Sequence, residues 1–450
     1  MKIFSVHFRA ILKDYCFNSS LAGLRYIADH RYHFTERIFW LGCVILSWIG
    51  SIHLIVNFMN SYYHNSVSMG VVSLRPMDEV LFPSMGVCEL GYTGEYYGEL
   101  KQIINALKAE VEAKNPGTSI EYNDDVEDYL TSVIFNNVNG FGSMSSFCTP
   151  HEDCDDCIKC PHDGYQAIAD RVIANCSQLF EECAWNGQIF DCCRFFKPLR
   201  TSVGTCFLLN SIQIVQKSGP NWLDMKVGMR HGSGHLQLSM KKANSIYVLS
   251  EEDIPHLLLK TLKSDQIPEG FNGILTLKIQ DTMNDKNVRN IKPESRKCVF
   301  PDEPSGTHYK KYSFTTCVTE CLKQGQLRIC NCTHFNMIVD KNDKSPICDY
   351  YGLVCLDKMG MISPPSSFLQ PWHPQGMSDC KCLPSCNEPQ ISVVSRWSVI
   401  DQAPKFRKVS IKLHQIPTQR YFRQAVREAL DIIGKFLENS LAFFHHFFNF

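Results

Sequence analysis

The sequence predicts a membrane-anchored α+β protein, in which one transmembrane helix near the N-terminus precedes a large, disulfide-rich domain of mixed α and β structure. Residues 38–58 form a run of 21 residues without a formal charge, and 15 of them are apolar. Of the 22 cysteines in the chain, 20 follow this run. Such a load is typical of domains that fold in an oxidising compartment, because so many free thiols would be a liability in the cytosol.

The composition excludes two other classes of protein. The 450 residues include 45 Lys and Arg against 46 Asp and Glu, without a dominant basic block. Nucleic-acid binders need clustered positive charge to neutralise phosphates, so no nucleic-acid partner is expected. Aromatic residues make up 11% of the chain, which excludes a disordered tail protein and supplies apolar side chains for a large core.

The apolar run has the length of a membrane span. As a helix, its 21 residues reach roughly 31 Å, and the hydrocarbon core of a bilayer is about 30 Å thick. Its remaining residues are small or polar and uncharged: Gly42, Ser47, Gly50, Ser51, His53 and Asn57. They form no polar face, which argues against a core helix of a soluble protein. Because 37 residues precede the run and no cleavage site follows it, we expect an anchor rather than a signal peptide.

Basic residues lie on only one side of the run. Six Lys and Arg precede it, whereas residues 60–74 contain none. Because Lys and Arg gather on the cytoplasmic side of a span, residues 1–37 are predicted to be cytoplasmic and residues 59–419 extracellular. The plasma membrane is the expected location, and the lipid bilayer an expected partner. Two exterior Asn-X-Ser/Thr sequons make Asn175 and Asn331 glycosylation candidates, whereas the sequon at Asn18 would stay unmodified in the cytoplasm.

The exterior part mixes strand-like and helix-like segments. Residues 82–88 are typical of an extended strand, and residues 105–113 and 165–180 have helical spacing. Short β-rich runs bounded by Gly or Pro follow at 205–214, 273–280 and 390–397. Because these strands are scattered along the chain, we expect a sheet assembled from distant pieces, with helical insertions.

Most exterior cysteines fall into two groups. The first group is Cys148, Cys154, Cys157, Cys160, Cys176, Cys183, Cys192 and Cys193. The second group is Cys298, Cys317, Cys321, Cys330, Cys332, Cys348, Cys355, Cys380, Cys382 and Cys386. Cys88 and Cys206 stand apart, each in a predicted strand.

The first group has two interpretations. The spacing Cys154-Cys157-Cys160 suits zinc, so a metal site is the alternative to disulfides. An oxidising exterior favours disulfides, and neither a metal ion nor a cofactor is expected. Because eight cysteines can pair in many ways, the connectivity of this group stays open.

Motifs of enzyme active sites are missing from the sequence. Ser233 lies in His231-Gly232-Ser233-Gly234-His235, which is not a Gly-X-Ser-X-Gly elbow. The chain contains neither a His-Glu-X-X-His motif nor a phosphate loop. Histidines such as His235 and His256 are interpreted as surface or core residues rather than catalytic bases. We therefore expect no catalytic residues and no enzyme.

Several short stretches, in a consistent order, point to one family. They are residues 21–27, 36–40, 82–88, 204–210, 296–300, 312–321, 330–332 and 380–386, the last reading Cys380-Lys381-Cys382-Leu383-Pro384-Ser385-Cys386. The combination of their cysteine spacings is more specific than any single stretch. In these stretches the chain resembles the degenerin/epithelial sodium channel family, most closely its insect pickpocket branch.

The resemblance implies a function. Members of this family are subunits of amiloride-sensitive, sodium-selective channels, gated by a ligand or by force, that carry sodium ions across the plasma membrane. The expected assembly is a homo- or hetero-trimer with related subunits. Each subunit would have two membrane helices and a hand-like exterior of palm, finger, knuckle and thumb regions. The alternative is a non-conducting, membrane-anchored regulatory or binding subunit that lacks its own pore helix.

The resemblance also implies disulfide pairs. Cys88 would join Cys206 in the palm. The second group would form a nested ladder in the thumb: Cys298 with Cys386, Cys317 with Cys382, Cys321 with Cys380, Cys330 with Cys355, and Cys332 with Cys348. A Cys-X-X-X-Cys pair presents both sulfurs on one face of a helix, so such bridges would fix the helix to a returning extended segment. We hypothesise that this stiffness makes the thumb a lever in gating, which unchanged gating after reduction of the ladder would contradict.

Both ends of the chain depart from the family pattern. Gly23 matches a glycine that influences gating in the family, but Ala22 replaces the expected histidine. A second membrane helix with a Gly/Ser-X-Ser constriction is missing, because residues 436–450 are short and contain charge. Residues 420–450 instead predict an amphipathic helix, as a degenerate or truncated second membrane segment. It would lie on the membrane or pack on the exterior domain, and a truncated or alternative product would explain it.

Overall fold

The computed structural model of the chain describes residues 14–17, 24–29, 31–64, 66–75, 78–89, 97–114, 124–135, 161–242, 244–256, 259, 261–263, 271–304, 306–340, 342–362, 380–400 and 406–426. The chain forms two compact units. The first comprises Met1–Gly70, Asn284–Lys297 and Phe422–Phe450, and the second comprises Val71–Met283 and Cys298–Tyr421. Each unit is described by itself below.

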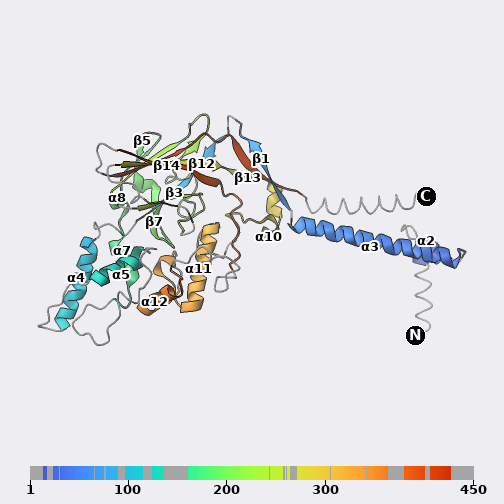
Figure 1. Cartoon of the computed structure of the whole chain (residues 1–450), viewed down its shortest axis with the longest axis horizontal. Coiled ribbons are helices and arrows are strands. Elements are labelled where there is room, and N and C mark those ends of the chain that lie inside the picture. Colours follow the sequence, from blue (N-terminus) through green and yellow to red (C-terminus); the bar gives the residue numbers. More distant parts are fainter. Residues whose placement is uncertain are drawn as a thin grey trace. The chain divides into compact units, whose positions relative to one another are not determined.

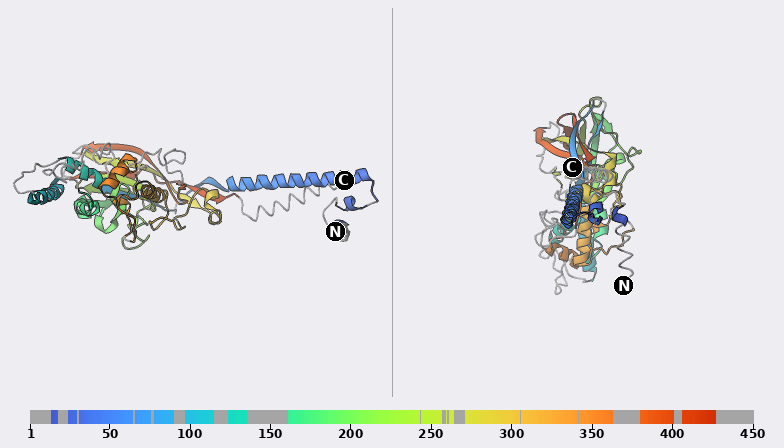
Figure 2. Two further views of the ribbon diagram at one scale, coloured as in Figure 1. Left: turned by 90° about the horizontal axis from the view of Figure 1, so that it is seen from below. Right: turned by 90° about the vertical axis from the view of Figure 1, so that its right-hand side faces the viewer.

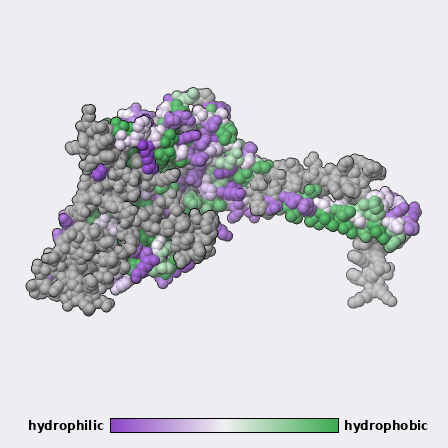
Figure 3. Space-filling model, in the orientation of Figure 1, coloured by the Kyte–Doolittle hydropathy of each residue, from purple (hydrophilic) through white to green (hydrophobic). Residues whose placement is uncertain are grey.

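One long helix dominates the first unit. α3 (Phe34–His64) is a single unbroken helix of 31 residues (Figure 2). It contains the predicted span, and its segment Phe34–Asn57 is long and apolar enough to cross a membrane. Apolar side chains are exposed along it (Figure 3), and only 6% of its most apolar window is buried. A helix that exposes so much apolar surface is suited to lipid rather than to water, and the chain is therefore membrane-anchored through α3.

A short helix packs against the start of α3. α2 (Leu24–Ala28) is joined to α3 by a hydrogen bond of 2.9 Å, in which Arg37 Nε donates to the carbonyl oxygen of Ile27. The ring of Tyr26 stacks on Trp40, with 4.6 Å between the ring centroids. These two contacts fix the turn between α2 and α3.

A buried arginine lies in the short segment of the first unit that precedes the second cysteine group. η2 (Lys286–Asn290) is followed by α10 (Pro293–Arg296), which begins with the proline that favours a first helical position. Arg296 is 2% exposed, and its guanidinium donates to the carbonyl oxygens of Arg289 and Ile291 at 3.2 and 2.9 Å. These two bonds, both from Nη1, join the guanidinium to the backbone of the segment that precedes α10.

Three further strands form a small sheet. They are β1 (Val67–Ser73), β16 (Gln419–Ala425) and β13 (Thr282–Asn284), in the order β1-β16-β13. The boundary between the units falls within each of these strands.

The structure corrects the first residues of the helix that is predicted over 420–450. Its first residues belong to strand β16, in which the amide of Tyr421 donates to Asp281 and the carbonyl oxygen of Arg423 accepts from Asp285, both at 2.8 Å. The spacing of apolar residues suggested a helix, but the backbone groups of neighbouring strands offered a ladder that the local pattern does not reveal. Residues 427–450, which hold the rest of the predicted helix, lie outside the described residues.

Two sheets form the centre of the second unit. The larger sheet has the order β14-β12-β15-β9-β4-β5. Its strands are β4 (Phe180–Trp185), β5 (Gln188–Phe190), β9 (His235–Met240), β12 (Phe271–Gln280), β14 (Gln390–Ile400) and β15 (Arg407–Leu413). Only the pair β12 and β15 is parallel among these described strands. Apart from the hairpin of β4 and β5, neighbouring strands of this sheet are distant in sequence, as the scattered strand pattern predicts.

The second sheet is antiparallel and has the order β11-β10-β3-β7-β6. Its strands are β3 (Ser84–Glu89), β6 (Phe196–Thr201), β7 (Gly204–Leu209), β10 (Asn244–Leu249) and β11 (Thr261–Lys263). A separate pair joins β2 (Val80–Leu81) to β8 (Lys226–Val227). Gly86 in β3 has no room for a side chain, since a Cβ there would lie 2.8 Å from Cγ of Pro255.

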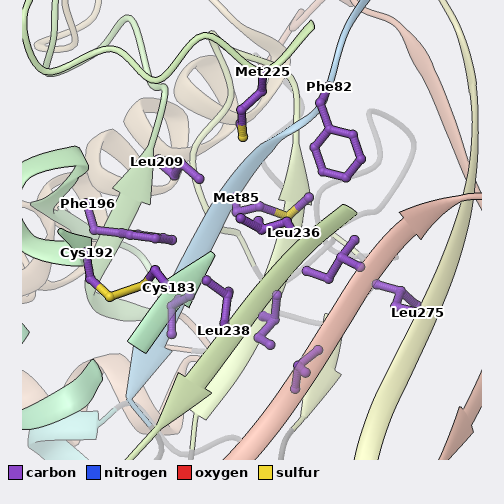
Figure 4. Packing of buried hydrophobic residues seen from close by; sticks show 14 of the residues in the cluster. Phe82, Met85, Cys183, Cys192, Phe196, Leu209, Met225, Leu236, Leu238 and Leu275 are labelled. Atoms are coloured by element: carbon purple, nitrogen blue, oxygen red, sulfur yellow. A yellow bond between two sulfur atoms is a disulfide. The ribbon is translucent and has the colours of Figure 1, made fainter. Parts of the chain in front are cut away.

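A continuous apolar core contains side chains of both sheets. Met85 and Leu209 come from the smaller sheet, and Leu236, Leu238 and Leu275 from the larger one (Figure 4). In β9 the buried leucines alternate with the exposed Gln237, as expected for a strand with one face on a core. The predicted strand segments fall in β3, β7, β12 and β14, although β7 ends at Leu209 rather than at residue 214.

Helices gather beside the sheets in a second cluster of the same unit (Figure 1). They are α4 (Tyr97–Lys114), α5 (Asp124–Phe135), α7 (Tyr165–Val172), η3 (Phe335–Met337), α11 (Phe314–Cys330) and α12 (Tyr350–Lys358). The prediction of a helix over 105–113 is confirmed by α4. The predicted helix over 165–180 is interrupted, because α7 ends at Val172, α8 (Cys176–Leu179) follows, and Phe180 already pairs in β4.

Candidate functional site at the base of α11

α11 is the helix that the cysteine ladder surrounds. It begins after Ser313, whose Oγ accepts a hydrogen bond of 3.1 Å from the amide of Thr316, while Oγ1 of Thr316 accepts one of 2.8 Å from the amide of Ser313. This reciprocal capping satisfies two backbone donors at the helix start. The helix ends at Cys330, and the next residue, Asn331, has φ of 58°, a left-handed conformation that asparagine tolerates well.

Disulfides tie α11 to segments on both sides. The bridges of this region are Cys298–Cys386, Cys317–Cys382, Cys321–Cys380, Cys330–Cys355 and Cys332–Cys348. A sixth bridge, Cys88–Cys206, joins directly opposed residues of β3 and β7. These six pairs are the ones that the family resemblance implies. The structure therefore places both ends of α11 under covalent constraint.

A glycine makes room for one rung of this ladder. A Cβ at Gly352 in α12 would lie 2.5 Å from Sγ of Cys332 and 2.9 Å from Cβ of Cys348. Real side chains do not approach so closely, so only glycine lets α12 pass beside this disulfide. Asp349 caps the same helix by accepting a hydrogen bond of 2.8 Å from the amide of Gly352. The role of Gly352 could not be predicted from the sequence, because nothing in the pattern marks this glycine as a contact of the Cys332–Cys348 bridge.

The first cysteine group supplies two further disulfides. Cys176 pairs with Cys193 and Cys183 with Cys192. Cys148, Cys154, Cys157 and Cys160 lie outside the described residues, and so does the proposed zinc spacing. Within the described ranges, no group of three or more His, Cys, Asp or Glu side chains is placed to hold a metal ion.

Buried carboxylates lie at the N-terminal end of α11. Asp253 is 7% exposed and accepts hydrogen bonds of 2.8 Å from Oγ1 of Thr315 and 2.7 Å from Oγ of Ser250. Glu252 is 1% exposed, and its Oε1 accepts a hydrogen bond of 2.7 Å from Oγ of Ser385. The two acids thus connect the segment after β10 to α11 and to the loop that carries Cys386.

Further hydrogen bonds to backbone groups stabilise this junction. Nε2 of Gln213 donates to the carbonyl oxygens of Glu252 and Lys311 at 2.7 and 2.9 Å, and Oε1 of Gln213 accepts from the amide of Lys311 at 3.1 Å. Beside the Cys298–Cys386 bridge, the amide of Cys386 donates to Val299 at 2.9 Å, and the amide of Val299 donates to Pro384 at 3.0 Å. Sequence reasoning missed the whole junction, because its buried polar residues come from distant segments.

The junction contains a carboxyl group that titrates near neutrality. Burial, together with the nearby charges of Asp253 and Glu251, raises the pKa of Glu252 to about 7. The hydrogen bond from Ser385 opposes this rise without cancelling it. Glu388 follows Cys386 by two residues but is exposed, so the buried carboxyl group of this junction that titrates near neutrality is that of Glu252.

We expect the second unit to lose stability as the pH rises from about 5 to 8. The folded state, with the pKa of Glu252 near 7, binds more protons over this range than an unfolded state with the usual value of 4.5. Glu252→Gln keeps the oxygen that accepts from Ser385 but removes the charge. The variant should be about 1 to 3 kcal/mol more stable at pH 8, with a flatter pH profile of melting temperature.

Glu251→Gln is the matched control. Glu251 pairs with Lys217 at 2.6 Å, and its side chain is 26% exposed, so its loss should cost less than about 1 kcal/mol. The charge of Glu251 is the smallest of the contributions to the raised pKa of Glu252, so the pH slope of this variant should change far less than that of Glu252→Gln. If melting temperature changes equally with pH in the wild type and in Glu252→Gln, Glu252 is not the group that causes the pH dependence.

Other predicted site residues are distributed over the molecule. Asn175 and Asn331 are both exposed, at the start of α8 and the end of α11. Gly23 lies outside the described residues. His256 is buried at 1% exposure, while His235 is partly exposed at the start of β9.

Comparison with known proteins gives consistent matches. The family model described as "Amiloride-sensitive sodium channel" matches residues 15–436. "Sodium channel protein Nach" of Drosophila ananassae is 22% identical over 362 residues, which cover 76% of this chain and 65% of that protein. Its Drosophila melanogaster namesake is 20% identical over 384 residues, or 78% and 68% of the two chains. "Pickpocket protein 28" of Drosophila melanogaster is 24% identical over 356 residues, or 71% and 54%. The chain thus spans about two thirds or less of the length of these relatives.

Proposed function

The chain belongs to the amiloride-sensitive sodium channel family, and from this premise we propose that it acts as a subunit of an amiloride-sensitive sodium channel, gated by a ligand or by force, in the plasma membrane. The observation that carries the proposal is the family match across residues 15–436, which includes both α3 and the disulfide-braced domain. Sodium ions and the lipid bilayer are then its partners. The family also supports a homo- or hetero-trimeric assembly with related subunits.

Sodium current in oocytes tests this proposal. The full chain is expressed alone and together with a conducting member of the family, and current is recorded with and without amiloride. Amiloride-blocked sodium current above that of uninjected cells, when the chain is expressed alone, supports a conducting channel subunit. Current that is altered only on co-expression assigns the regulatory role. Surface expression without any effect on current in either setting contradicts both.

We further propose that residues 1–37 are cytoplasmic and that the disulfide-braced domain is extracellular. The two exposed sequons then predict glycans at Asn175 and Asn331. Asn175→Asp and Asn331→Asp remove each sequon with little structural cost, because aspartate also serves as an N-cap and also tolerates the left-handed backbone. Each single variant should lose the apparent mass of one glycan. The apparent mass of the double variant should no longer change on treatment with a glycosidase.

The sequon at Asn18 provides the internal control for this topology. Asn18→Asp should leave the apparent mass unchanged, because residues on the cytoplasmic side do not meet the glycosylation machinery. A mass change with Asn18→Asp, combined with none for the exterior pair, would reverse the proposed orientation.

A further inference from the structure

A cavity lies in the second unit beside the Cys176–Cys193 disulfide. Its volume is about 790 Å³, and α7, β6, β7 and residues 338–340 supply most of its lining. Cys176 and Cys193 both line it. Cavities of this size are in the range that accommodates small organic ligands. The cavity therefore gives a dissolved molecule a route to this bridge.

The two neighbouring disulfides differ in burial. Cys176 and Cys193 are half-buried, whereas Cys183 and Cys192 are 0% and 8% exposed. The Cys183–Cys192 bridge lies among the apolar residues of the core, near Phe196 and Leu238 (Figure 4). Because thiol–disulfide exchange needs access to a sulfur, the Cys176–Cys193 bridge is the more open of these two bridges to an external thiol.

Both positively and negatively charged side chains line the cavity. Nζ of Lys197 donates to the carbonyl oxygen of Cys193 at 3.1 Å, which holds an ammonium group beside the bridge. Arg200 pairs with Asp170 at 2.7 Å, and Asp340 adds a second carboxylate to the lining. A small zwitterionic thiol carries carboxylate and ammonium groups that complement these charges. The ammonium of Lys197 also attracts the thiolate, which is the attacking form.

We propose that the Cys176–Cys193 disulfide is a redox modification site, reached through this cavity by small zwitterionic thiols of the extracellular fluid. The thiolate attacks Sγ of Cys193, and the bond between the two cysteine sulfurs breaks. Its electron pair stays on Cys176, which takes a proton from water, while Cys193 holds a mixed disulfide with the small thiol. A second thiolate attacks the sulfur of the bound thiol, so that Cys193 is released reduced and two thiols leave as their own disulfide.

The modification has a local consequence. The Cys176–Cys193 bridge joins α8 to α9 (Cys192–Phe195), and the Cys183–Cys192 bridge separately joins α9 to β4. Loss of the first bridge frees α8 at the cavity wall, while the second keeps the β4–β5 hairpin closed. Reduction thus changes the cavity without unfolding the sheet.

Differential alkylation of the purified full chain tests the proposal. The protein is incubated with reduced glutathione, quenched with iodoacetamide at intervals, and the modified cysteines are counted by mass spectrometry. Cys176 and Cys193 should become labelled at least tenfold faster than Cys183 and Cys192. Equal rates, or faster labelling of the buried pair, would overturn the proposal.

A comparison of thiols tests the role of charge. Lys197→Met should slow the reaction with glutathione several-fold relative to the reaction with neutral 2-mercaptoethanol. Equal slowing of both reactions would contradict the charge argument, and the wild-type rates with the two thiols test it even if the variant does not fold. The inference rests on the proposed exterior placement for its physiological setting, but the alkylation assay measures the bridge alone. Its failure is therefore distinguishable from a failure of the channel proposal.

Discussion

Removal of the Cys298–Cys386 disulfide by Cys298→Ala with Cys386→Ala is expected to lower the free energy of unfolding of the second unit by about 3 to 4 kcal/mol. Both cysteines are fully buried, and the bridge spans 88 residues of sequence. Cys317–Cys382 already closes most of that loop, so removal of the outer bridge frees roughly two dozen residues in the unfolded chain. Loss of two buried sulfurs adds to the entropic cost. Urea unfolding of the solubilised chain measures the effect.

The matched control is the Cys330–Cys355 bridge. It encloses the Cys332–Cys348 bridge, so its removal frees only about nine residues, and its two cysteines are half-buried. Alanine at both positions should therefore cost about 1 kcal/mol less than at the outer pair. If removal of the Cys298–Cys386 bridge lowers the free energy of unfolding no more than removal of the control bridge, the junction at the base of α11 does not depend on its disulfide.

The same variants test the lever hypothesis for gating. If α11 transmits force, the Cys298–Cys386 variant should change the gating of any current that the channel assay reveals, once surface expression is matched. Unchanged gating in a folded, surface-expressed variant would contradict the lever.

Lys323→Met is expected to destabilise the second unit by about 3 to 5 kcal/mol. Lys323 in α11 pairs with Asp343, and both side chains are only 2% exposed. Oδ1 of Asp343 also accepts from the amide and Oγ of Ser345, at 3.0 and 2.7 Å. Burial opposes ionisation, but the hydrogen bonds from Lys323 and Ser345 outweigh it and hold the pKa of Asp343 at about 2. Methionine would leave this carboxylate buried without its counter-charge.

A double-mutant cycle isolates the ion pair. Lys323→Met with Asp343→Asn keeps an oxygen for the Ser345 donors and removes both charges, so it should recover about 2 kcal/mol or more of the loss. Acid provides a second readout. Wild type should lose stability as the pH falls from about 4 to 2, since the depressed pKa favours the folded state only above that window. Lys323→Met alone should instead gain stability in acid, and a parallel loss in both proteins would contradict the pairing.

Features with a local signal in the sequence could be predicted. The uncharged apolar run marks α3 without reference to the rest of the chain, and apolar β-branched runs mark strands such as β12. The spacing of Cys317 and Cys321 places both on one face of a helix, and α11 has that helix. These signals depend on residues close in sequence, and they can therefore be recognised without knowledge of the fold.

Features that depend on distant partners could not be predicted. Residues 420–425 have helical spacing, but the neighbouring strands make them a strand. Glu252 and Asp253 resemble a solvated acidic turn in the sequence, and only the approach of Ser385 and Thr315 buries and binds them. The sequence does not identify the Cys176–Cys193 pair, because spacing alone does not choose between neighbouring cysteines such as Cys192 and Cys193.

The placement of the disulfide-braced domain outside the cell is the claim on which the channel proposal most depends. Mass tagging of thiols in intact and selectively permeabilised cells with an impermeant maleimide tests it directly, with Cys16→Ser as the control for the cytoplasmic signal. We expect Cys16, a free cysteine, to react without reduction but only after permeabilisation, and the domain cysteines to react from outside only after reduction. Domain cysteines that react unreduced, and only from the cytosolic side, would contradict it.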